Sequence, residues 1–397
     1  MFDHFRRKFF GLLSVLMLCM ALPSLAGAWV TVKGDGDRWM KFGAGLRASY
    51  QTTSDSSLDA RGGDIALEDM RLYTLTQVHK NIVFEFNTEV RSKADNADSD
   101  YTDNSFHDMY VLDARATLTV QGFDIWFGKF LPPSERSNLD GPYFLNVWDF
   151  PLATSPYPAI AAGRDQGVMI YKEYDGGKFK WAYGAFEGRK NATNADTNPD
   201  EHDNFQHGFR ATYNFWTPEP GYYTTSAYYG AKDVLAVAFV ARYEEDGAGT
   251  GLTNATQGDY FGWSVDVLME KKLSSGAVVN LEASYYDTDT DDIDDGSITQ
   301  GNAYRMLASY MLPNKVGWGK FQPYLRYQHS TQDNGCAGAF CGPATSNFGT
   351  RGIMEGGLNY IIDGHNAKIM SSFASDTQSS NAQPVDTFTL GMQFQLL

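Results

Sequence analysis

Residues 123–174 read FDIWFGKFLPPSERSNLDGPYFLNVWDFPLATSPYPAIAAGRDQGVMIYKEY, and this stretch decides the fold prediction. An alternating run at 123–130 stops at Pro132-Pro133, and a similar run resumes at Arg164 and continues to Tyr174. The segment between them, 132–163, is rich in proline, glycine and aromatics and follows neither a helical nor a strand period. A loop of that length inside a compact fold is uncommon and tends to be functional. We therefore expect 132–163 to fold back into the mouth of a barrel as a constriction loop.

The chain begins with the pattern of a secretory signal peptide at residues 1–28. Arg6, Arg7 and Lys8 precede an apolar run at 9–22, and small residues at 26–28 fit a cleavage site. The apolar run is too short for a membrane anchor. Residues 29–397 contain no linker, no change in composition and no apolar run long enough for a transmembrane helix. We expect one domain over 29–397 after export.

Alternating segments of about ten residues, separated by turn signals, fill the rest of the chain, and this rhythm is the signature of a transmembrane β-barrel. Short connections alternate with long ones, as periplasmic turns and extracellular loops do in such barrels. One connection of the short set, 216–232, is long. We predict sixteen antiparallel strands at 39–51, 66–78, 82–91, 106–120, 123–131, 164–174, 178–189, 205–215, 233–243, 260–271, 277–286, 303–312, 321–328, 351–361, 367–375 and 387–396.

Parity within the predicted strands separates a lipid face from a lumen face. In 387–396 the even positions are apolar and the odd positions are polar or glycine. The strands of a soluble β-sandwich would also alternate between apolar and polar residues. A soluble fold, however, does not account for sixteen strands, a signal peptide and the lack of helical periodicity. We therefore predict an all-β barrel in the outer membrane of a Gram-negative bacterium, where closure satisfies every backbone group. Its aromatic girdles are expected to include Trp126, Trp181, Tyr183, Tyr310 and Tyr360.

The motif Gly128-Lys129-Phe130-Leu131-Pro132-Pro133 is followed by Glu135-Arg136 and, later, by Gly163-Arg164-Asp165-Gln166-Gly167-Val168. This combination resembles the phosphate-selective porin O and P family of Gram-negative outer membranes. The resemblance is clearest between residues 106 and 243 and extends more loosely through the strand rhythm of the mature chain. It implies a sixteen-stranded porin, a homotrimer, with an inward-folded loop between the fifth and sixth strands, here 132–163.

The chain departs from that family in two places. The family's phosphate-specific members have clustered lysines in the constriction loop, whereas this loop offers Arg136, with Arg164 at its far end, against Glu135, Asp140 and Asp149. Phosphate specificity therefore does not follow for this chain. The last residue is Leu397, where outer-membrane barrels usually end in an aromatic residue.

Charge is distributed unevenly: the long loops are acidic, and the predicted lumen face carries an excess of cations. We expect a water-filled channel for small hydrophilic solutes, leaning toward small anions, because guanidinium groups stay charged and match carboxylate and phosphate oxygens. Arg47, Arg71, Arg115 and Arg164 are expected to form a positive stripe opposite the loop. The predicted pore-lining and constriction residues are Arg47, Arg71, Arg115, Lys129, Arg136, Arg164, Arg210, Arg305 and Arg326.

Other chemistries find little support in the sequence. The acidic run that begins at Asp287 starts like a calcium loop, but Asp292 and Ile298 stand where Gly and Glu are needed. Loose divalent binding among lipopolysaccharide phosphates stays open. His329 and Ser330 point to opposite faces of a strand, which does not suit catalysis. We expect no enzyme activity, no metal site, no cofactor and no nucleic-acid partner, since nucleotide and haem motifs are also absent.

Cys336 and Cys341 lie close together in a glycine-rich loop of an exported chain, and we predict a disulfide between them. A Cys-x4-Cys metal site is the alternative, but no His or further Cys is near in sequence.

One alternative to a channel is a structural barrel that acts as a sheath around a partner protein, such as an exported electron-transfer cytochrome. A sheath needs a lumen wide enough for a protein, and an inward-folded 132–163 loop would block it.

Overall fold

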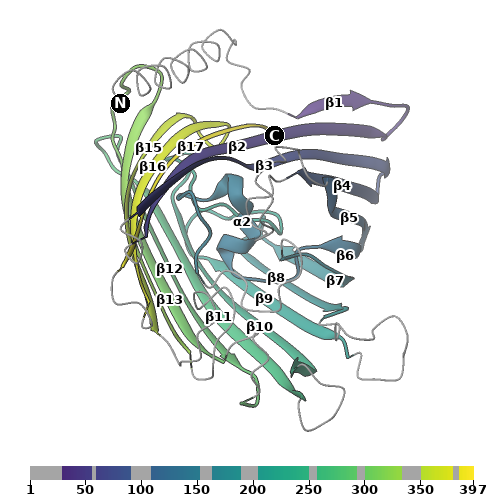
Figure 1. Cartoon of the computed structure of the whole chain (residues 1–397). Helices are drawn as coiled ribbons and strands as arrows, with labels where there is room; N and C mark the ends of the chain where they lie inside the picture. The colour runs from purple at the N-terminus through teal and green to yellow at the C-terminus, as the bar shows by residue number, and fades with distance from the viewer. Residues whose placement is uncertain are drawn as a thin grey trace.

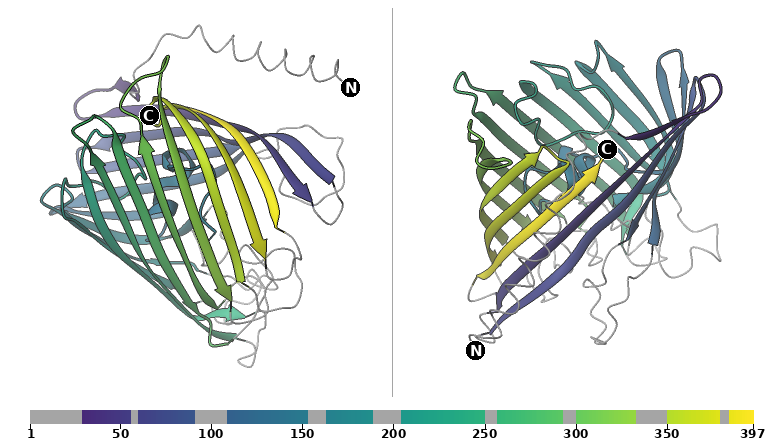
Figure 2. Two further views of the ribbon diagram at one scale, coloured as in Figure 1. Left: turned by 90° about the vertical axis from the view of Figure 1, so that its left-hand side faces the viewer. Right: turned by 90° about the horizontal axis from the view of Figure 1, so that it is seen from above.

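The computed structural model describes residues 29–55, 60–90, 109–152, 163–188, 204–249, 257–292, 300–332, 350–378 and 384–397. These residues form a closed antiparallel barrel of sixteen strands, β2 to β17, with a short strand β1 beside the ring and a helix α2 inside it (Figure 1). The two further views in Figure 2 show the barrel strands lying side by side and tilted. Tilted strands are required to close a sheet of this kind.

The barrel strands are β2 (Trp39–Asp55), β3 (Ala60–His79), β4 (Ile82–Val90), β5 (Met109–Val120), β6 (Phe123–Phe130), β7 (Asp165–Tyr174), β8 (Phe179–Phe186), β9 (Gln206–Asn214), β10 (Val234–Gly249), β11 (Gln257–Lys272), β12 (Val278–Asp289), β13 (Gly301–Met311), β14 (Lys320–Gln332), β15 (Thr350–Asp363), β16 (Ala367–Gln378) and β17 (Val385–Leu396). The predicted fold class and strand order are confirmed. The turns after β3, β5, β7, β11, β13 and β15 share one end of the barrel, here named the turn end; the opposite end is the loop end.

The ring closes where the last strand meets the first barrel strand. β17 pairs with β2 from Thr387↔Thr53 to Leu396↔Ala44. β1 (Val30–Lys33) pairs with β2 from Val30↔Phe42 to Lys33↔Trp39. β3 pairs with one edge of β2 along its whole length. β1 must therefore pair with the same edge of β2 as β17, just beyond the last residue that β17 covers. Strand β1 was not predicted, because its four residues are too few to show a period.

Tight turns are encoded locally. Between β5 and β6, Gln121 and Gly122 both have positive φ, at 51° and 75°. Two successive residues with positive φ make the type I′ turn, whose twist matches that of a two-residue β-hairpin. The predicted connection at 121–122 is therefore confirmed.

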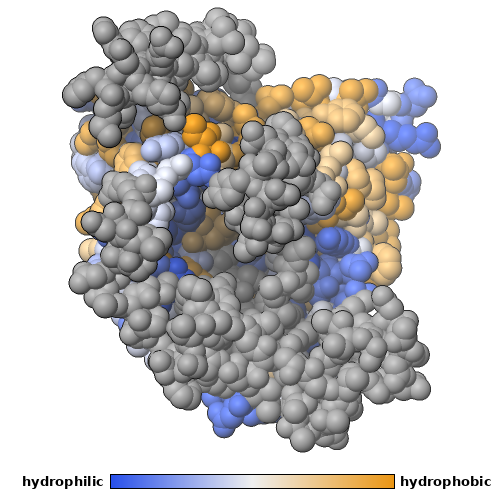
Figure 3. All heavy atoms as spheres, in the orientation of Figure 1, coloured by the Kyte–Doolittle hydropathy of each residue, from blue (hydrophilic) through white to orange (hydrophobic). Residues whose placement is uncertain are grey.

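Outward-facing side chains are largely apolar, and lumen-facing side chains are largely polar and buried. In β12, for example, Leu281 and Tyr285 are exposed, whereas Asn280 and Glu282 are buried. Figure 3 shows hydrophobic residues over the outer strands and hydrophilic residues inside the barrel opening. This is the inverse of a soluble protein and matches a lipid-facing wall. Trp126 departs from the prediction: it is buried on the lumen side of β6 instead of lying in a girdle.

Among the described residues, no helix is both long enough and apolar enough to cross a bilayer. The predicted signal peptide at 1–28 lies outside the described residues, as do Cys336 and Cys341.

Candidate constriction site

Residues 131–152, here named the α2 insert, leave the end of β6 and enter the lumen (Figure 1). Pro132-Pro133 ends the strand, because proline has no N–H for the ladder. The Glu135 carboxylate then accepts hydrogen bonds from the backbone N–H of Ser137 (2.8 Å) and Asn138 (2.9 Å). Such a cap satisfies orphan donors and suits the positive end of a helix.

Helix α2 (Arg136–Phe144) corrects the sequence prediction, which expected no helix in 132–163. The helix is kinked at Gly141, whose φ of 64° favours glycine, and Pro142 follows directly. Proline and glycine inside a helix hide its period, so the pattern gave no signal. An inward-folded segment was predicted, and the described part of it does lie in the lumen.

Donors on the barrel wall bind the main-chain carbonyls of the α2 insert. They come from strands around much of the ring, so the insert is held from several sides. Hydrogen bonds from charged donors contribute roughly 1.5–3 kcal/mol each. The bonds are Arg242 Nε to Pro133 O (2.8 Å), Arg210 Nη1 to Ser134 O (2.9 Å), Lys368 Nζ to Leu145 O (2.7 Å), Asn359 Nδ2 to Asn146 O (2.8 Å), Arg47 Nη2 to Trp148 O (2.5 Å) and Arg326 Nη1 to Asp149 O (2.8 Å).

Aromatic side chains of the insert fit against glycines of the wall. A Cβ at Gly45 would lie 2.6 Å from ring atoms of Tyr143, and the ring of Trp148 covers Gly391 in the same way. Both rings are almost fully buried. Close approach of this kind requires glycine, because a side chain on the wall would displace the ring.

A second segment, residues 215–233 between β9 and β10, also enters the lumen, from the turn end; we name it the β9–β10 segment. Its Glu219 carboxylate binds the Arg136 guanidinium through two hydrogen bonds of 2.9 and 2.7 Å. Burial alone would raise the pKa of Glu219, but the Arg136 guanidinium lowers it to about 2. The carboxylate is therefore charged at neutral pH, and the bidentate pair fixes α2 to the β9–β10 segment.

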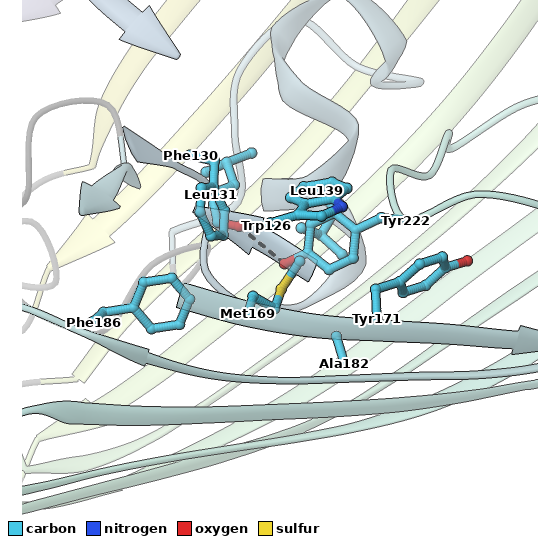
Figure 4. Close-up of a cluster of buried hydrophobic side chains, with 9 residues drawn as sticks. All are labelled: Trp126, Phe130, Leu131, Leu139, Met169, Tyr171, Ala182, Phe186 and Tyr222. Carbon is cyan, nitrogen blue, oxygen red and sulfur yellow. Dashed lines mark hydrogen bonds between the residues drawn. The ribbon is translucent and has the colours of Figure 1, made fainter. Parts of the chain in front are cut away.

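Apolar packing joins the same two segments to the wall. Trp126 and Phe130 of β6, Leu139 of α2 and Tyr222 of the β9–β10 segment belong to one buried cluster (Figure 4). The Tyr222 hydroxyl donates to the main-chain oxygen of Leu131 at 2.9 Å. Trp126 and Tyr222 meet edge to face with ring centroids 4.9 Å apart, a favourable aromatic geometry. Because Trp126 belongs to this lumenal cluster, it is absent from the outer girdle.

The predicted positive stripe is largely neutralised. Arg47, Arg71, Arg115 and Arg164 line the lumen, but each has a carboxylate oxygen within ion-pair distance, and so do the other predicted arginines. The field that a passing ion would feel is therefore weaker than the cation count suggests. The pairs are Arg47–Asp69 (2.7 Å), Arg71–Glu89 (2.8 Å), Arg115–Glu85, Arg136–Glu219 (2.7 Å), Arg164–Asp113 (3.2 Å), Arg210–Asp266, Arg305–Glu282 (3.1 Å) and Arg326–Glu355.

Lys129 differs from the other predicted pore residues. It pairs in the ladder with Ala114 and Gln166. Directly opposed residues point to one side of a sheet, and Gln166 is exposed there, so Lys129 lies on the outward side rather than in the lumen. Its Nζ donates to Val111 O at 3.1 Å. The positive φ of the preceding Gly128, 126°, marks a local irregularity in β6.

His365 is a lumenal contact that the sequence analysis missed. It lies in the turn between β15 and β16 and contacts both inserted segments: its ring nitrogens are 3.2 Å from Tyr143 O and 2.8 Å from Ala227 O. Burial, with Lys368 nearby, lowers the pKa of His365 to about 3, so the ring is neutral at pH 7. The unusual length of 216–232 was the one available signal that this end of the barrel is occupied.

No group of three or more His, Cys, Asp or Glu side chains in the described ranges is arranged to hold a metal ion.

No family model matches the chain, and no curated protein matches it in sequence. Solved structures do resemble it. The high-pH structure of Pseudomonas putida OprB is 10% identical with a TM-score of 0.60 over 90% of this chain and 94% of that one. An anion-selective porin from Comamonas acidovorans is 9% identical with a TM-score of 0.56 over 90% and 100%. In-vitro folded OmpT, an outer membrane protein of Vibrio cholerae, is 12% identical with a TM-score of 0.55 over 92% and 99%.

Identities this low show a shared fold and no more. The chain therefore has the barrel fold of outer-membrane porins and channels, and the resemblance to the phosphate-selective O and P family remains a prediction.

Proposed function

We propose that this protein is an outer-membrane porin, a water-filled channel for diffusion of small hydrophilic solutes. The observation that carries this proposal is a closed barrel, apolar outside and polar inside, with a segment folded into its lumen. Barrels of this size enclose a lumen wide enough for an aqueous path, and an inserted segment narrows that path to the size of small solutes. The fold shared with known porins supports the same conclusion.

Localisation and assembly follow as parts of this proposal. We place the barrel in the outer membrane of a Gram-negative bacterium, with the turn end in the periplasm, its outer face in contact with lipid and lipopolysaccharide. We propose a homotrimer; one similar solved structure, of Vibrio cholerae OmpT, is described as a trimer form. Neither catalytic residues nor a cofactor are assigned.

The sheath alternative is less favourable. The α2 insert and the β9–β10 segment occupy the lumen and are bonded to its wall at many points. A folded partner protein would have to displace both segments and break these bonds.

Ion preference is proposed to be weak and toward anions. Three lumen-facing cations, Lys180, Arg242 and Lys368, donate to main-chain oxygens and form no ion pair with a carboxylate of the described residues. Burial without a carboxylate partner disfavours the charged form of a lysine, whereas a guanidinium stays charged. Arg242 is therefore the main positive charge of the wall that no acid compensates directly. Because all three are buried, a strong selectivity is not expected.

Single-channel recording in a planar bilayer tests the proposal. Purified protein should give discrete conductance steps, and in a salt gradient its reversal potential should lie slightly on the anion side. Protein that is folded by heat-modifiable electrophoresis and yet never conducts would contradict the channel. A reversal potential on the cation side would contradict the ion preference and leave the channel standing.

A further inference from the structure

Two segments from opposite ends of the barrel meet in its middle. The α2 insert follows β6 from the loop end, and the β9–β10 segment follows β9 from the turn end. Their central contact is the pair Arg136–Glu219, whose side chains are 1% and 2% exposed. Arg136 Nη1 also donates to the main-chain oxygen of Thr225 at 2.9 Å. A buried, bidentate pair of this kind is costly to break by removing one partner.

A second set of contacts lies one turn further along α2. Both carboxylate oxygens of Asp140 accept hydrogen bonds of 2.6 Å, one from Thr224 Oγ1 and one from Ser226 Oγ. The backbone N–H of Ser226 donates to Phe144 O at 3.1 Å. The two segments are thus joined by side-chain and main-chain bonds along the length of α2.

The β9–β10 segment also reaches the wall behind it. The Glu270 carboxylate accepts from the backbone N–H of Tyr228 (2.8 Å) and Gly230 (2.7 Å), and Asn280 Nδ2 donates to Ser226 O at 2.7 Å. Glu270 and Asn280 are essentially inaccessible to solvent, at 1% and 0% exposure. The segment therefore bridges from α2 to β11 and β12 and closes that side of the lumen.

Barrel closure does not explain a segment of this length. The other turn-end connections, such as 121–122 and 175–178, join neighbouring strands with a few residues, as antiparallel pairs allow. Residues 215–233 do far more than join β9 to β10. Their contacts go inward, to α2 and to the lumenal side chains of β11 and β12.

We propose that the β9–β10 segment is a second constriction element, and that its junction with α2 sets the conductance of the channel. In the arrangement described here the junction holds the channel in a narrow state. Withdrawal of the β9–β10 segment toward the turn end, with loss of the Arg136–Glu219 and Asp140 contacts, widens it. This inference rests on the proposed porin function.

A cross-link across the junction provides the sharpest test. Asp140→Cys and Ser226→Cys are combined in a Cys336→Ser, Cys341→Ser background, since the two side chains are in direct contact. The oxidised protein should conduct in a narrow, quiet state, and reduction in the same bilayer should raise the mean conductance by about twofold or more, as a wider constriction admits more ions. The background variant without the new cysteines should not respond to reductant.

A second variant loosens the junction without a new bond. Glu219→Gln keeps the shape of the side chain and removes its charge. Arg136 then loses its ion pair with the β9–β10 segment and keeps the one with Asp266 of the wall (3.8 Å), so the mean conductance should rise. The matched control is Asp376→Asn, which removes the partner of Arg351 (2.6 Å) on the wall; among the described residues, Asp376 bonds to Arg351 and to neither inserted segment. It should leave the conductance unchanged. Unheated electrophoresis confirms that each variant is a folded barrel.

The outcomes separate the two proposals. If oxidised and reduced cross-link variants conduct equally, or if Glu219→Gln behaves like Asp376→Asn, the β9–β10 segment does not set the conductance, while the porin function stands. If wild type and every variant fail to conduct, the porin function fails, and this inference fails with it.

Discussion

Arg47 of β2 holds Trp148 of the α2 insert in two ways. Its guanidinium lies 4.0 Å from the centroid of the indole ring, and its Nη2 donates to the main-chain oxygen of the same residue. Arg47 is also paired with Asp69 at 2.7 Å. A residue expected to attract anions is therefore bound by the insert on one side and by Asp69 on the other, which makes Arg47 a positioning residue first.

Replacing Arg47 should loosen the insert. Arg47→Ala removes the stack, the carbonyl bond and the nearer of two guanidinium partners of Asp69, since Arg71 stays 3.9 Å from that carboxylate. A broken buried pair costs about 3–5 kcal/mol. Denaturant unfolding in detergent measures the loss of stability. Arg351→Ala, at a pair that is about a fifth exposed, should cost about 1 kcal/mol or less. Equal losses in the two variants would contradict the role given to Arg47.

Removing a lumenal acid should strengthen the anion preference. Asp113→Asn removes a negative charge that lies 3.2 Å from the Arg164 guanidinium. One added positive charge felt across about 8 Å of water attracts an anion by about 0.5 kcal/mol and repels a cation by as much. The difference of about 1 kcal/mol corresponds to about fivefold in the permeability ratio of anions to cations. The reversal potential in a salt gradient measures the change. Asp233→Asn, at an exposed pair with Lys271 on the turn end, serves as the control; a shift toward cations in Asp113→Asn would overturn the charge assignment.

Asp140 should make the stability of the barrel depend on pH. Burial raises the pKa of this carboxyl to about 8, despite the nearby Arg136 and the hydrogen bonds from Ser226 and Thr224. The unfolded chain has a pKa near 4 at this group, so folding takes up a proton between these values. The contribution to stability is full below about pH 4 and is lost as the pH rises through about 8.

Asp140→Asn keeps the neutral form at every pH. We therefore expect the denaturant midpoint of unfolding of Asp140→Asn to increase relative to that of wild type as the pH rises from about 5 to about 9. The Glu282 carboxylate faces the same site, and Glu282→Gln should raise the midpoint in the same direction by relieving repulsion with ionised Asp140. If the stability of Asp140→Asn relative to wild type instead increases as the pH falls, Asp140 is ionised in the folded protein.

The bridge between Cys336 and Cys341 remains a prediction, because both residues lie outside the described ranges. A loop this short should add less than the roughly 3 kcal/mol expected for a fifteen-residue loop. Thiol labelling of denatured, unreduced protein should modify neither cysteine, and labelling after reduction should modify both. Full labelling before reduction would exclude the bridge.

Strands were predictable because alternation is a local property. The predicted segment 82–91 became Ile82–Val90, and 387–396 became Val385–Leu396. Helix α2 was not predictable in the same way, because Gly141 and Pro142 interrupt its nine residues and its ends are fixed by contacts with distant strands. The local sequence pattern thus predicts the strands of the barrel but not the segments that lie in its lumen.

The position of the constriction was predicted, but the ion pairs that neutralise its arginines were not. The lumenal positions of Arg47 and Arg164 followed from parity. Their partners, Asp69 and Asp113, are on other strands, and the pairing depends on register and on side-chain direction that parity alone does not give. The lumenal role of Glu219 was hidden for a different reason: the position of the β9–β10 segment depends on contacts made across the barrel.

The edge of β2 that takes both β17 and β1 has a consequence for how the barrel is made. Leu396 pairs with Ala44, and Val30 pairs with Phe42, so Trp29 and Leu397, the first and last described residues, both approach Gly43. Every other join in the ring connects strands that are neighbours in sequence, whereas this one spans almost the whole polypeptide and carries the largest loop-closure entropy. Pairing β17 with β2 therefore costs more chain entropy than any other pairing in the ring. Until these two strands pair, both edges of the sheet offer unpaired backbone groups to other chains.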